Sequence, residues 1–339
     1  MAIGVIDLHC DTADRLAWQT LPAELRAVTG QDFYGPGDEQ DPAACRSLAC
    51  NHCHVSHEKI GATPWAQCFA CFVPDELTPE QAVAFEAHVS TYFKQQLANN
   101  PKVKVARSAE DVKASLAEGG VAAIRTIENA RLFAADLGLV ERLAADGLVM
   151  ASLSWNAGGP LASGHDTHEH MSAAGLAALA EMERCHVALD VSHLNDECFA
   201  DVAAHATRPF CASHSNSRAV CGHKRNLTDD QFRTVMDAGG VAGLNYCSGF
   251  LSDGAWGDRA ASITFDQVAA HIEHWLDLGG EDAIALGGDF DGTTTPDFLD
   301  GADKLPAFQD LLVARFGQPI TEKLCHKNAL TFLNRVQSA

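Results

Sequence analysis

Six side chains of the kinds that bind metal ions stand at or just after the ends of short apolar runs. They are His9, Asp11, Glu128, His193, His214 and Asp289. Imidazole and carboxylate groups are common ligands of Zn²⁺ and of other divalent first-row ions. Burying six such groups together without a cation would be costly. Five ligands suit two ions that share one carboxylate better than one catalytic ion with an open position. The residue types therefore predict a metal centre.

The spacing of the first pair supports this prediction. His9 and Asp11 are two residues apart, so in an extended strand both side chains point to the same side and can hold one ion. A single buried histidine is more often a hydrogen-bonded core residue, and a carboxylate at a strand end is often only a helix N-cap. The prediction therefore depends on the joint placement of all six residues.

Eight short apolar runs, separated by longer helical patterns, must position these side chains. They predict parallel strands buried on both faces, at residues 3–10, 65–73, 121–127, 148–153, 187–191, 209–213, 240–246 and 283–288. The count favours an α/β fold, a (β/α)8 TIM-type barrel of the metal-dependent hydrolase kind, with its active site at the carboxyl ends of the strands. The alternative, a doubly wound sheet, would usually carry a glycine-rich loop where this chain has His9, Cys10 and Asp11.

Length and charge limit the function classes. We expect residues 1–339 to form a single domain, with a loop or insertion around 29–62 that is rich in Gly, Asp, Cys and His. The formal net charge of −21 argues against nucleic-acid and anionic-membrane partners. No secretory signal or spanning segment is evident, so we expect a cytoplasmic protein. Charged residues are only 20% of the chain, which favours a homodimer.

Twelve cysteines in such a chain indicate reduced thiols or metal ligands rather than disulfides. Cys68 and Cys71 lie in one expected strand, where residues three apart face opposite sides, so we expect core thiols. A loop contains a further group of residues that leaves an extra structural metal site open: Cys50, Cys53, His54 and His57.

Six segments in a fixed order carry a resemblance to a known family. They are residues 7–12 (DLHCDT), 127–128 (IE), 189–193 (LDVSH), 212–218 (ASHSNSR), 225–228 (RNLT) and 287–292 (GGDFDG). The chain resembles the renal (membrane) dipeptidase family of zinc peptidases, especially its soluble bacterial members. The resemblance implies a (β/α)8 barrel with two zinc ions. It implies that His9 and Asp11 bind one ion, that His193 and His214 bind the other, and that Glu128 bridges them.

The resemblance also implies hydrolysis of free dipeptides by a metal-bridging hydroxide. Asp289 corresponds to the family's acid that takes a proton from the water and passes it to the leaving amine. Arg225 corresponds to the clamp for the substrate carboxylate, which a guanidinium can hold through two parallel hydrogen bonds.

One segment departs from the family pattern. The mammalian member has a histidine after the fourth strand that contacts the substrate and stabilises the developing oxyanion, and here Trp155 takes that place. We expect Trp155 and Phe250 to contact the substrate. Three histidines of the following loop are candidates for the missing contact: His165, His168 and His170.

Two other functions were weighed against a dipeptidase. Other metal-dependent amide or lactone hydrolases of this barrel type commonly show His-x-His on the first strand and often a carbamylated lysine. This chain has His-x-Asp and ends its third expected strand with Thr126, Ile127 and Glu128. A catalytically silent metal-binding relative would have a damaged ligand set, whereas all the expected ligands are present. The dipeptidase is therefore the leading hypothesis.

Overall fold

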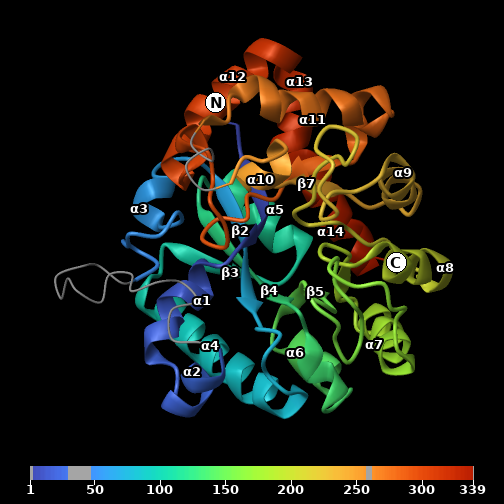
Figure 1. Cartoon of the computed structure of the whole chain (residues 1–339). Coiled ribbons are helices and arrows are strands. Elements are labelled where there is room, and N and C mark those ends of the chain that lie inside the picture. Colours follow the sequence, from blue (N-terminus) through green and yellow to red (C-terminus); the bar gives the residue numbers. More distant parts are fainter. Residues whose placement is uncertain (1–2, 30–46, 257–261, 339) are drawn as a thin grey trace.

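A curled sheet of parallel strands forms the centre of the computed structural model, which describes residues 3–29, 47–256 and 262–338 (Figure 1). The strands of the described residues are β1 Val5–Cys10, β2 Trp65–Phe72, β3 Val103–Ala106, β4 Val121–Glu128, β5 Leu148–Ser152, β6 Ala188–Asp190, β7 Ala242–Leu244 and β8 Ile284–Leu286. Their order across the sheet is β6-β5-β4-β2-β1-β8-β7, and β3 pairs with β4 outside this path.

Helices surround this sheet (Figure 1). They are α1 Thr12–Ala17, α2 Ala23–Thr29, α3 His57–Ile60, α4 Pro79–Asn99, α5 Ala109–Ala117, α6 Leu139–Ala145, α7 Ala173–Arg184, α8 Asp196–His205, α9 Asp229–Asp237, α10 Ser248–Leu251, α11 Phe265–Asp277, α12 Leu305–Phe316, α13 Gln318–Glu322 and α14 Asn328–Ser338. A π-helical turn, Lys323–Lys327, joins α13 to α14. Several helices begin at side-chain caps. Thr78 and Thr228, for example, cap α4 and α9 with capping boxes that satisfy otherwise unpaired backbone N–H groups.

Seven of the eight expected strands are present, mostly with slightly shorter bounds. The sixth, residues 209–213, is not a strand. There, single-residue bridges pair Asp190 with Cys211 and Ala212 with Ala242, and so link the end strands β6 and β7. The sequence analysis missed β3, a four-residue strand whose two middle residues are exposed. The α/β class and the curled parallel sheet are thus established, and a complete eight-stranded barrel stays a prediction.

The central strands are buried along their whole length, as the continuous apolar runs predicted. All residues of β1, β2 and β4 are buried. Alternate residues enter two different apolar clusters, because successive side chains of a strand face opposite ways. Cys71 belongs to the larger cluster and Cys68 to the smaller one. Both are core thiols on opposite faces, as expected, and they cannot share an ion.

The predicted insertion around residues 29–62 lies largely outside the described residues. Of its described part, residues 47–62 form bends and the short helix α3. None of the helices in the described ranges combines the length and the apolar character needed to cross a bilayer. The single domain, the homodimer and the cytoplasmic location stay predictions.

Two glycines let the sheet approach the segment that carries His214. A Cβ atom placed on Gly243 of β7 would lie 1.9 Å from the carbonyl oxygen of Ser213, and one on Gly287, just after β8, would lie 1.8 Å from the same atom. Neither distance leaves room for a methyl group. The position of His214 therefore depends on backbone-to-backbone packing that only glycine permits.

Replacement of Gly287 by alanine should lower the free energy of unfolding by about 2 kcal/mol or more, because overpacked sites in rigid backbone cost this much. Chemical denaturation of the two proteins measures the difference. Gly158→Ala is the matched control, since the nearest atom to its added Cβ would be Ser163 Oγ at 3.9 Å. Equal stabilities of Gly287→Ala and Gly158→Ala would contradict this account of the close approach.

Candidate metal centre

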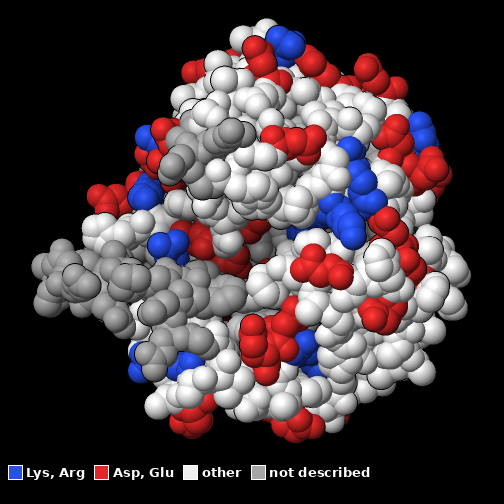
Figure 2. Space-filling model, viewed as in Figure 1, with Lys and Arg blue, Asp and Glu red and all other residues white. Residues whose placement is uncertain are grey.

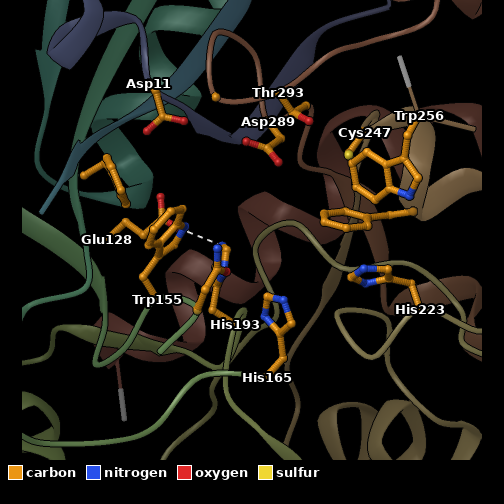
Figure 3. A pocket seen from close by; sticks show the side chains of 14 residues that line it. Asp11, Glu128, Trp155, His165, His193, His223, Cys247, Trp256, Asp289 and Thr293 are labelled. Carbon is orange, nitrogen blue, oxygen red and sulfur yellow. Dashed lines mark hydrogen bonds and ion pairs between the residues drawn. The ribbon is translucent and has the colours of Figure 1, made fainter. Parts of the chain in front are cut away.

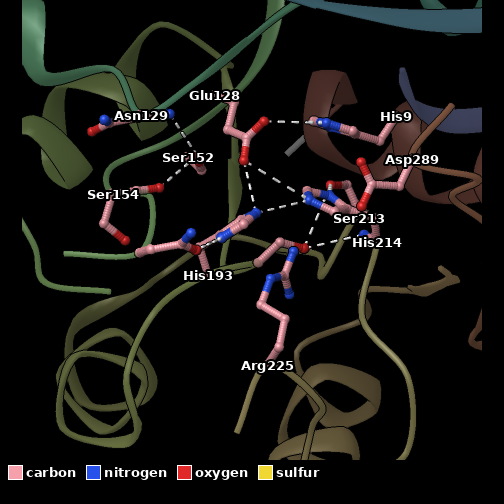
Figure 4. Close-up of polar contacts among 12 residues, drawn as sticks. His9, Glu128, Asn129, Ser152, Ser154, His193, Ser213, His214, Arg225 and Asp289 are labelled. Atoms are coloured by element: carbon pink, nitrogen blue, oxygen red, sulfur yellow. Dashed lines mark hydrogen bonds and ion pairs between the residues drawn. The ribbon is translucent and has the colours of Figure 1, made fainter. Parts of the chain in front are cut away.

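The carboxyl ends of the strands bring the six expected side chains together, five of them labelled in Figure 4 and Asp11 in Figure 3. His9 belongs to β1 and Glu128 is the last residue of β4. The others follow a strand or a bridge within three residues: Asp11 after β1, His193 after β6, His214 after the bridge residue Ala212, and Asp289 after β8. All six are at most 8% exposed, so the site lies inside the fold.

Glu128 lies between two groups of ligand atoms. Its Oε1 is 2.7 Å from His193 Nε2 and 4.0 Å from His214 Nε2. Its Oε2 is 3.2 Å from His9 Nε2, and that nitrogen is 3.6 Å from Asp11 Oδ2. One oxygen of a single carboxylate therefore faces each group, which is the arrangement that a bridging ligand requires.

The donor set fits metal ions. His9, Asp11 and Glu128 offer ligand atoms within 4.8 Å of one another, and so do Glu128, His193 and His214. A third such group contains His9, His214 and Asp289, so Asp289 borders the same space. Asp11 Oδ1 is buried without a hydrogen-bond partner among the described residues, and His9 Nε2 makes no hydrogen bond there beyond its ion-pair contacts with Glu128 and Asp11. Buried polar atoms are normally satisfied, and a cation between them would satisfy both.

The electrostatics also favour a cation. Burial raises the pKa of Asp11 to about 6 and the pKa of Asp289 to about 7, although the nearby His9 imidazole lowers both. Burial opposes the charged form of Glu128 as well, but the imidazoles of His193 and His9 hold the pKa of its carboxyl well below the usual range. Three carboxyl groups in one dry space repel one another, and a divalent ion would offset that repulsion.

Hydrogen bonds fix the orientation of two imidazoles. His193 Nδ1 is 3.0 Å from Asn156 Oδ1, so Nδ1 carries the proton and Nε2 presents its lone pair to the centre. His214 Nδ1 is 2.6 Å from Ser213 Oγ, which in turn donates to Asp190. Such outer partners set the tautomer and raise the basicity of a ligating histidine. His193 and Asp289 also have positive φ angles of 74° and 57°, a sparsely populated conformation that is typical of functional sites.

Removing the acceptor at residue 156 should weaken metal binding. Asn156→Ala leaves His193 free to rotate and to change tautomer, and comparable losses lower metal affinity about 10–100-fold. Competition with a chromophoric chelator measures the dissociation constants of both ions, and that of the ion held by His193 should change most. Asn156→Asp is the control, because it keeps an acceptor at the same place. Unchanged zinc affinity in Asn156→Ala would show that this hydrogen bond does not orient the ligand.

A cavity of about 280 Å³ opens onto the ligand cluster (Figure 3). Asp11, Glu128 and Asp289 line it, and acidic side chains are visible at the bottom of a hollow near the centre of the face in Figure 2. Trp155 and Phe250 also line the cavity, so both stand where a substrate-contacting residue must stand. A space of this size beside candidate metal ligands suits a small molecule.

Arg225 is not among the described residues that line the cavity, but it points toward the ligand cluster (Figure 4), and its guanidinium carbon is 5.9 Å from the ring centroid of Phe250, which lines the cavity. Its residue exposure is only 3%. Nη1 donates to Ser215 Oγ at 2.7 Å, whereas Nε and Nη2 have no hydrogen-bond partner among the described residues. Burial lowers the pKa of Arg225, and Asp289 and Glu128 counter this effect. The guanidinium thus keeps two donor atoms available for an anionic ligand.

The three candidate histidines of the loop after β5 differ in position. His165 lines the cavity, with its ring centroid 6.0 Å from that of His193. His168 and His170 lie outside, exposed and paired with Glu197 and Asp201. The structure therefore leaves His165 as the candidate. Burial lowers the pKa of its imidazole to about 2, so the ring is neutral at physiological pH.

Several cavity residues were missed in the sequence analysis. Phe72, Asn156, His223, Cys247 and Trp256 all line the cavity. Except for Phe72, which ends β2, they lie in loops, where no periodic pattern shows the direction of a side chain.

The proposed extra metal site receives no support. None of the potential metal-binding groups among the described residues includes Cys50, Cys53, His54 or His57, and His54 Nδ1 instead accepts a hydrogen bond from the Asp291 backbone.

A parallel α/β sheet with a histidine–carboxylate cluster at its strand ends defines a metal-dependent hydrolase. The chain belongs to the membrane dipeptidase family, peptidase family M19, whose family model matches residues 2–339. This membership confirms the resemblance seen in the sequence.

Solved structures of similar proteins agree. A structure described as the dipeptidase AC, a metallopeptidase, has 29% sequence identity and a TM-score of 0.86, and the match covers 100% of both chains. A metallopeptidase from Rhodobacter sphaeroides, solved with a phosphinate mimic of the dipeptide L-Ala-D-Ala, has 28% identity and a TM-score of 0.84, and covers 99% of this chain and 100% of that one. An uncharacterized Klebsiella pneumoniae protein encoded in the pqqA 5′ region is 34% identical over 254 residues, 72% of this chain and 93% of its own length.

Proposed function

We propose that this protein is a dinuclear zinc dipeptidase that hydrolyses the peptide bond of free dipeptides. The observation that carries the proposal is the position of Glu128, with one carboxylate oxygen toward His9 and Asp11 and the other toward His193 and His214. Membership in a dipeptidase family supports the reaction. The similar metallopeptidase solved with a dipeptide mimic supports the size of the substrate.

In this proposal His9 and Asp11 hold one zinc ion, His193 and His214 hold the other, and Glu128 bridges them. Bound zinc lowers the pKa of a water molecule and polarises the carbonyl of the scissile bond. The remaining work falls to side chains of the chain itself. They must handle the proton, orient the substrate and keep bulk water away from the buried site.

Asp289 is placed to hold and move the proton. Asn245 Nδ2 donates to its Oδ2 at 3.0 Å, which fixes the carboxyl group and leaves Oδ1 free to accept a proton. Asp289 lines the cavity beside the ligand cluster, within reach of the attacking water and of the leaving amine. A general base must satisfy this geometry before its pKa matters.

We assign the binding of the substrate carboxylate to Arg225. Its unpaired Nε and Nη2 can donate two parallel hydrogen bonds to the two carboxylate oxygens. A longer peptide has an amide in place of that carboxylate after its second residue, so it would lose this contact. His165 is the described histidine placed to donate a hydrogen bond to the developing oxyanion, as a neutral imidazole can.

We also propose that the sheet closes into the (β/α)8 barrel. The bridges from Asp190 to Cys211 and from Ala212 to Ala242 support closure, because they place residues 211–212 between β6 and β7.

The experiment that tests the function is turnover of a panel of L,L- and L,D-dipeptides together with zinc analysis. The zinc-loaded protein should cleave members of the panel, a chelator should abolish cleavage, and added zinc should restore it. Asp289→Asn is the internal control, because it should keep both ions yet lose at least about 100-fold in kcat, as expected for a general acid–base residue. Two bound zinc ions with no cleavage of any dipeptide would contradict the proposal and favour another amide or a lactone as substrate.

The proposed contact between Arg225 and the substrate carboxylate leads to a separate prediction. Arg225→Met should raise KM for dipeptides at least about tenfold, because a charge-assisted, bidentate contact is lost. It should change kcat/KM much less for the corresponding dipeptide amides, which have no terminal carboxylate. Arg142→Met is the matched control, since Arg142 is exposed and pairs with Asp136 outside the cavity. Equal losses on dipeptides and on their amides would remove Arg225 from the clamp role.

A further inference from the structure

We propose that the cavity contains a separate subsite for a bulky, uncharged side chain of the C-terminal substrate residue, formed by His223, Phe250 and Trp256. The inference rests on the proposed function and deepens it, because it selects among dipeptides. We call these three side chains the Trp256 wall.

Aromatic side chains lie on two opposite sides of the cavity (Figure 3). On one side the rings of Phe72 and Trp155 are 4.9 Å apart, edge to face. The Trp256 wall stands on the other side. The ring centroid of His223 is 4.7 Å from that of Phe250 and 5.9 Å from that of Trp256, and the centroids of Phe250 and Trp256 are 5.6 Å apart. A dipeptide has two side chains, and the site offers each an aromatic surface.

The carboxylate clamp determines which side chain meets which surface. The guanidinium carbon of Arg225 is 5.9 Å from the centroid of the Phe250 ring. A carboxylate bound there belongs to the C-terminal residue, and the side chain of that residue leaves the same Cα atom. The C-terminal side chain is therefore the one within reach of the Trp256 wall, and the N-terminal side chain faces Phe72 and Trp155.

Hydrogen bonds connect the clamp to the wall. Asn226, next to Arg225, donates through Nδ2 to the Phe250 carbonyl at 2.9 Å. Asn216 Nδ2 donates to the same carbonyl at 3.3 Å. His271, fully buried, accepts at Nδ1 from the Ser217 backbone and donates from Nε2 to the carbonyl of Leu251 in α10. These bonds tie the loop that carries His223 and Arg225 to the helix that carries Phe250.

The wall selects against charge. Outside the candidate ligands and Asp289, the described residues that line the cavity carry no carboxylate, ammonium or guanidinium group. A lysine side chain bound against the wall would lose hydration without gaining a partner, and a glutamate could gain one only from Arg225, which the terminal carboxylate of the substrate would already occupy. An aromatic or large aliphatic side chain would instead bury apolar area.

Trp256 has a surface suited to a ligand. It is 51% exposed, which is unusual for so large an apolar side chain, yet its indole is seated by a specific contact. A Cβ atom placed on Gly249 of α10 would lie 2.2 Å from Cε2 of the indole. Only glycine lets the indole lie flat against α10, so Gly249→Ala should push it away without altering any side chain of the ligand cluster.

The test compares kcat/KM for Ala-Phe, Ala-Ala, Ala-Lys and Ala-Glu, each with an L or a D C-terminal residue. We compare the substrates whose C-terminal residue has the configuration, L or D, that is cleaved faster. For these, kcat/KM of the zinc-loaded protein should be at least about tenfold higher for Ala-Phe than for Ala-Ala, the effect of burying one large apolar side chain. Ala-Lys and Ala-Glu should be poorer than Ala-Ala. The Ala-Phe preference should fall at least about fivefold in Trp256→Ala and in Gly249→Ala.

Two control variants test whether the Ala-Phe preference comes from the Trp256 wall. Phe72→Ala should alter the ratio of Phe-Ala to Ala-Ala and leave the Ala-Phe preference in place. Leu311→Ala removes a different exposed apolar side chain, 41% exposed on α12, and should change neither ratio. As a readout independent of turnover, calorimetry should show that phosphinate dipeptide mimics with a C-terminal benzyl or methyl side chain lose their affinity difference in Trp256→Ala.

The outcomes separate this inference from the proposed function. Cleavage of dipeptides with an Ala-Phe preference that is absent, or that survives in Trp256→Ala and Gly249→Ala, would overturn the subsite and leave the dipeptidase standing. A change of molar mass in Trp256→Ala, measured by light scattering, with an unchanged preference would assign Trp256 to a contact between copies of the chain and also overturn the subsite. Failure to cleave any dipeptide would overturn both.

Discussion

The rest of the site depends on one constraint. The carboxylate of Glu128 lies between His9 and Asp11 on one side and His193 and His214 on the other. Glu128 is buried, and a buried carboxylate is tolerated only where positive charge or hydrogen-bond donors compensate it. Under the proposed function the positive charge would come from two zinc ions, one held by His193 beside one oxygen and the other held by His9 beside the second oxygen. Because these residues leave different strands, the carboxylate also fixes how those strands must end. A shift of any strand by one residue would turn its ligand away from the centre.

Residues outside the ligand cluster hold its histidines in place through hydrogen bonds. His193 depends on Asn156, and His214 depends on Ser213 and Asp190. The close approach of Gly243 and Gly287 to the Ser213 carbonyl sets the backbone that presents His214. Arg225 and the Trp256 wall stand on a loop and a helix that are bonded to each other. Backbone packing and buried hydrogen bonds therefore fix the base of the ligand cluster, while much of the substrate side of the cavity is built from loop side chains.

The residues that stand at strand ends could be predicted from the periodicity of the sequence. Glu128 and His9 lie at the ends of mostly apolar runs, so their place at the strand ends follows from the pattern, and the order of the motifs identified the family. Residues 209–213 look like a further strand in sequence but form only single-residue bridges. Short β3 has too few residues and too mixed a pattern to be distinguished from a loop. Asn156, His223 and Trp256 carry no signal in the sequence, because their directions come from tertiary hydrogen bonds and from a contact with Gly249.

The measurement that tests the central claim most directly is a crystal structure of the zinc-loaded protein with anomalous diffraction recorded on both sides of the zinc absorption edge. The account predicts two zinc peaks about 3.5–4 Å apart, with one oxygen of Glu128 bound to each, His9 and Asp11 on one ion, and His193 and His214 on the other. A single zinc peak, or two peaks that do not share Glu128, would contradict it.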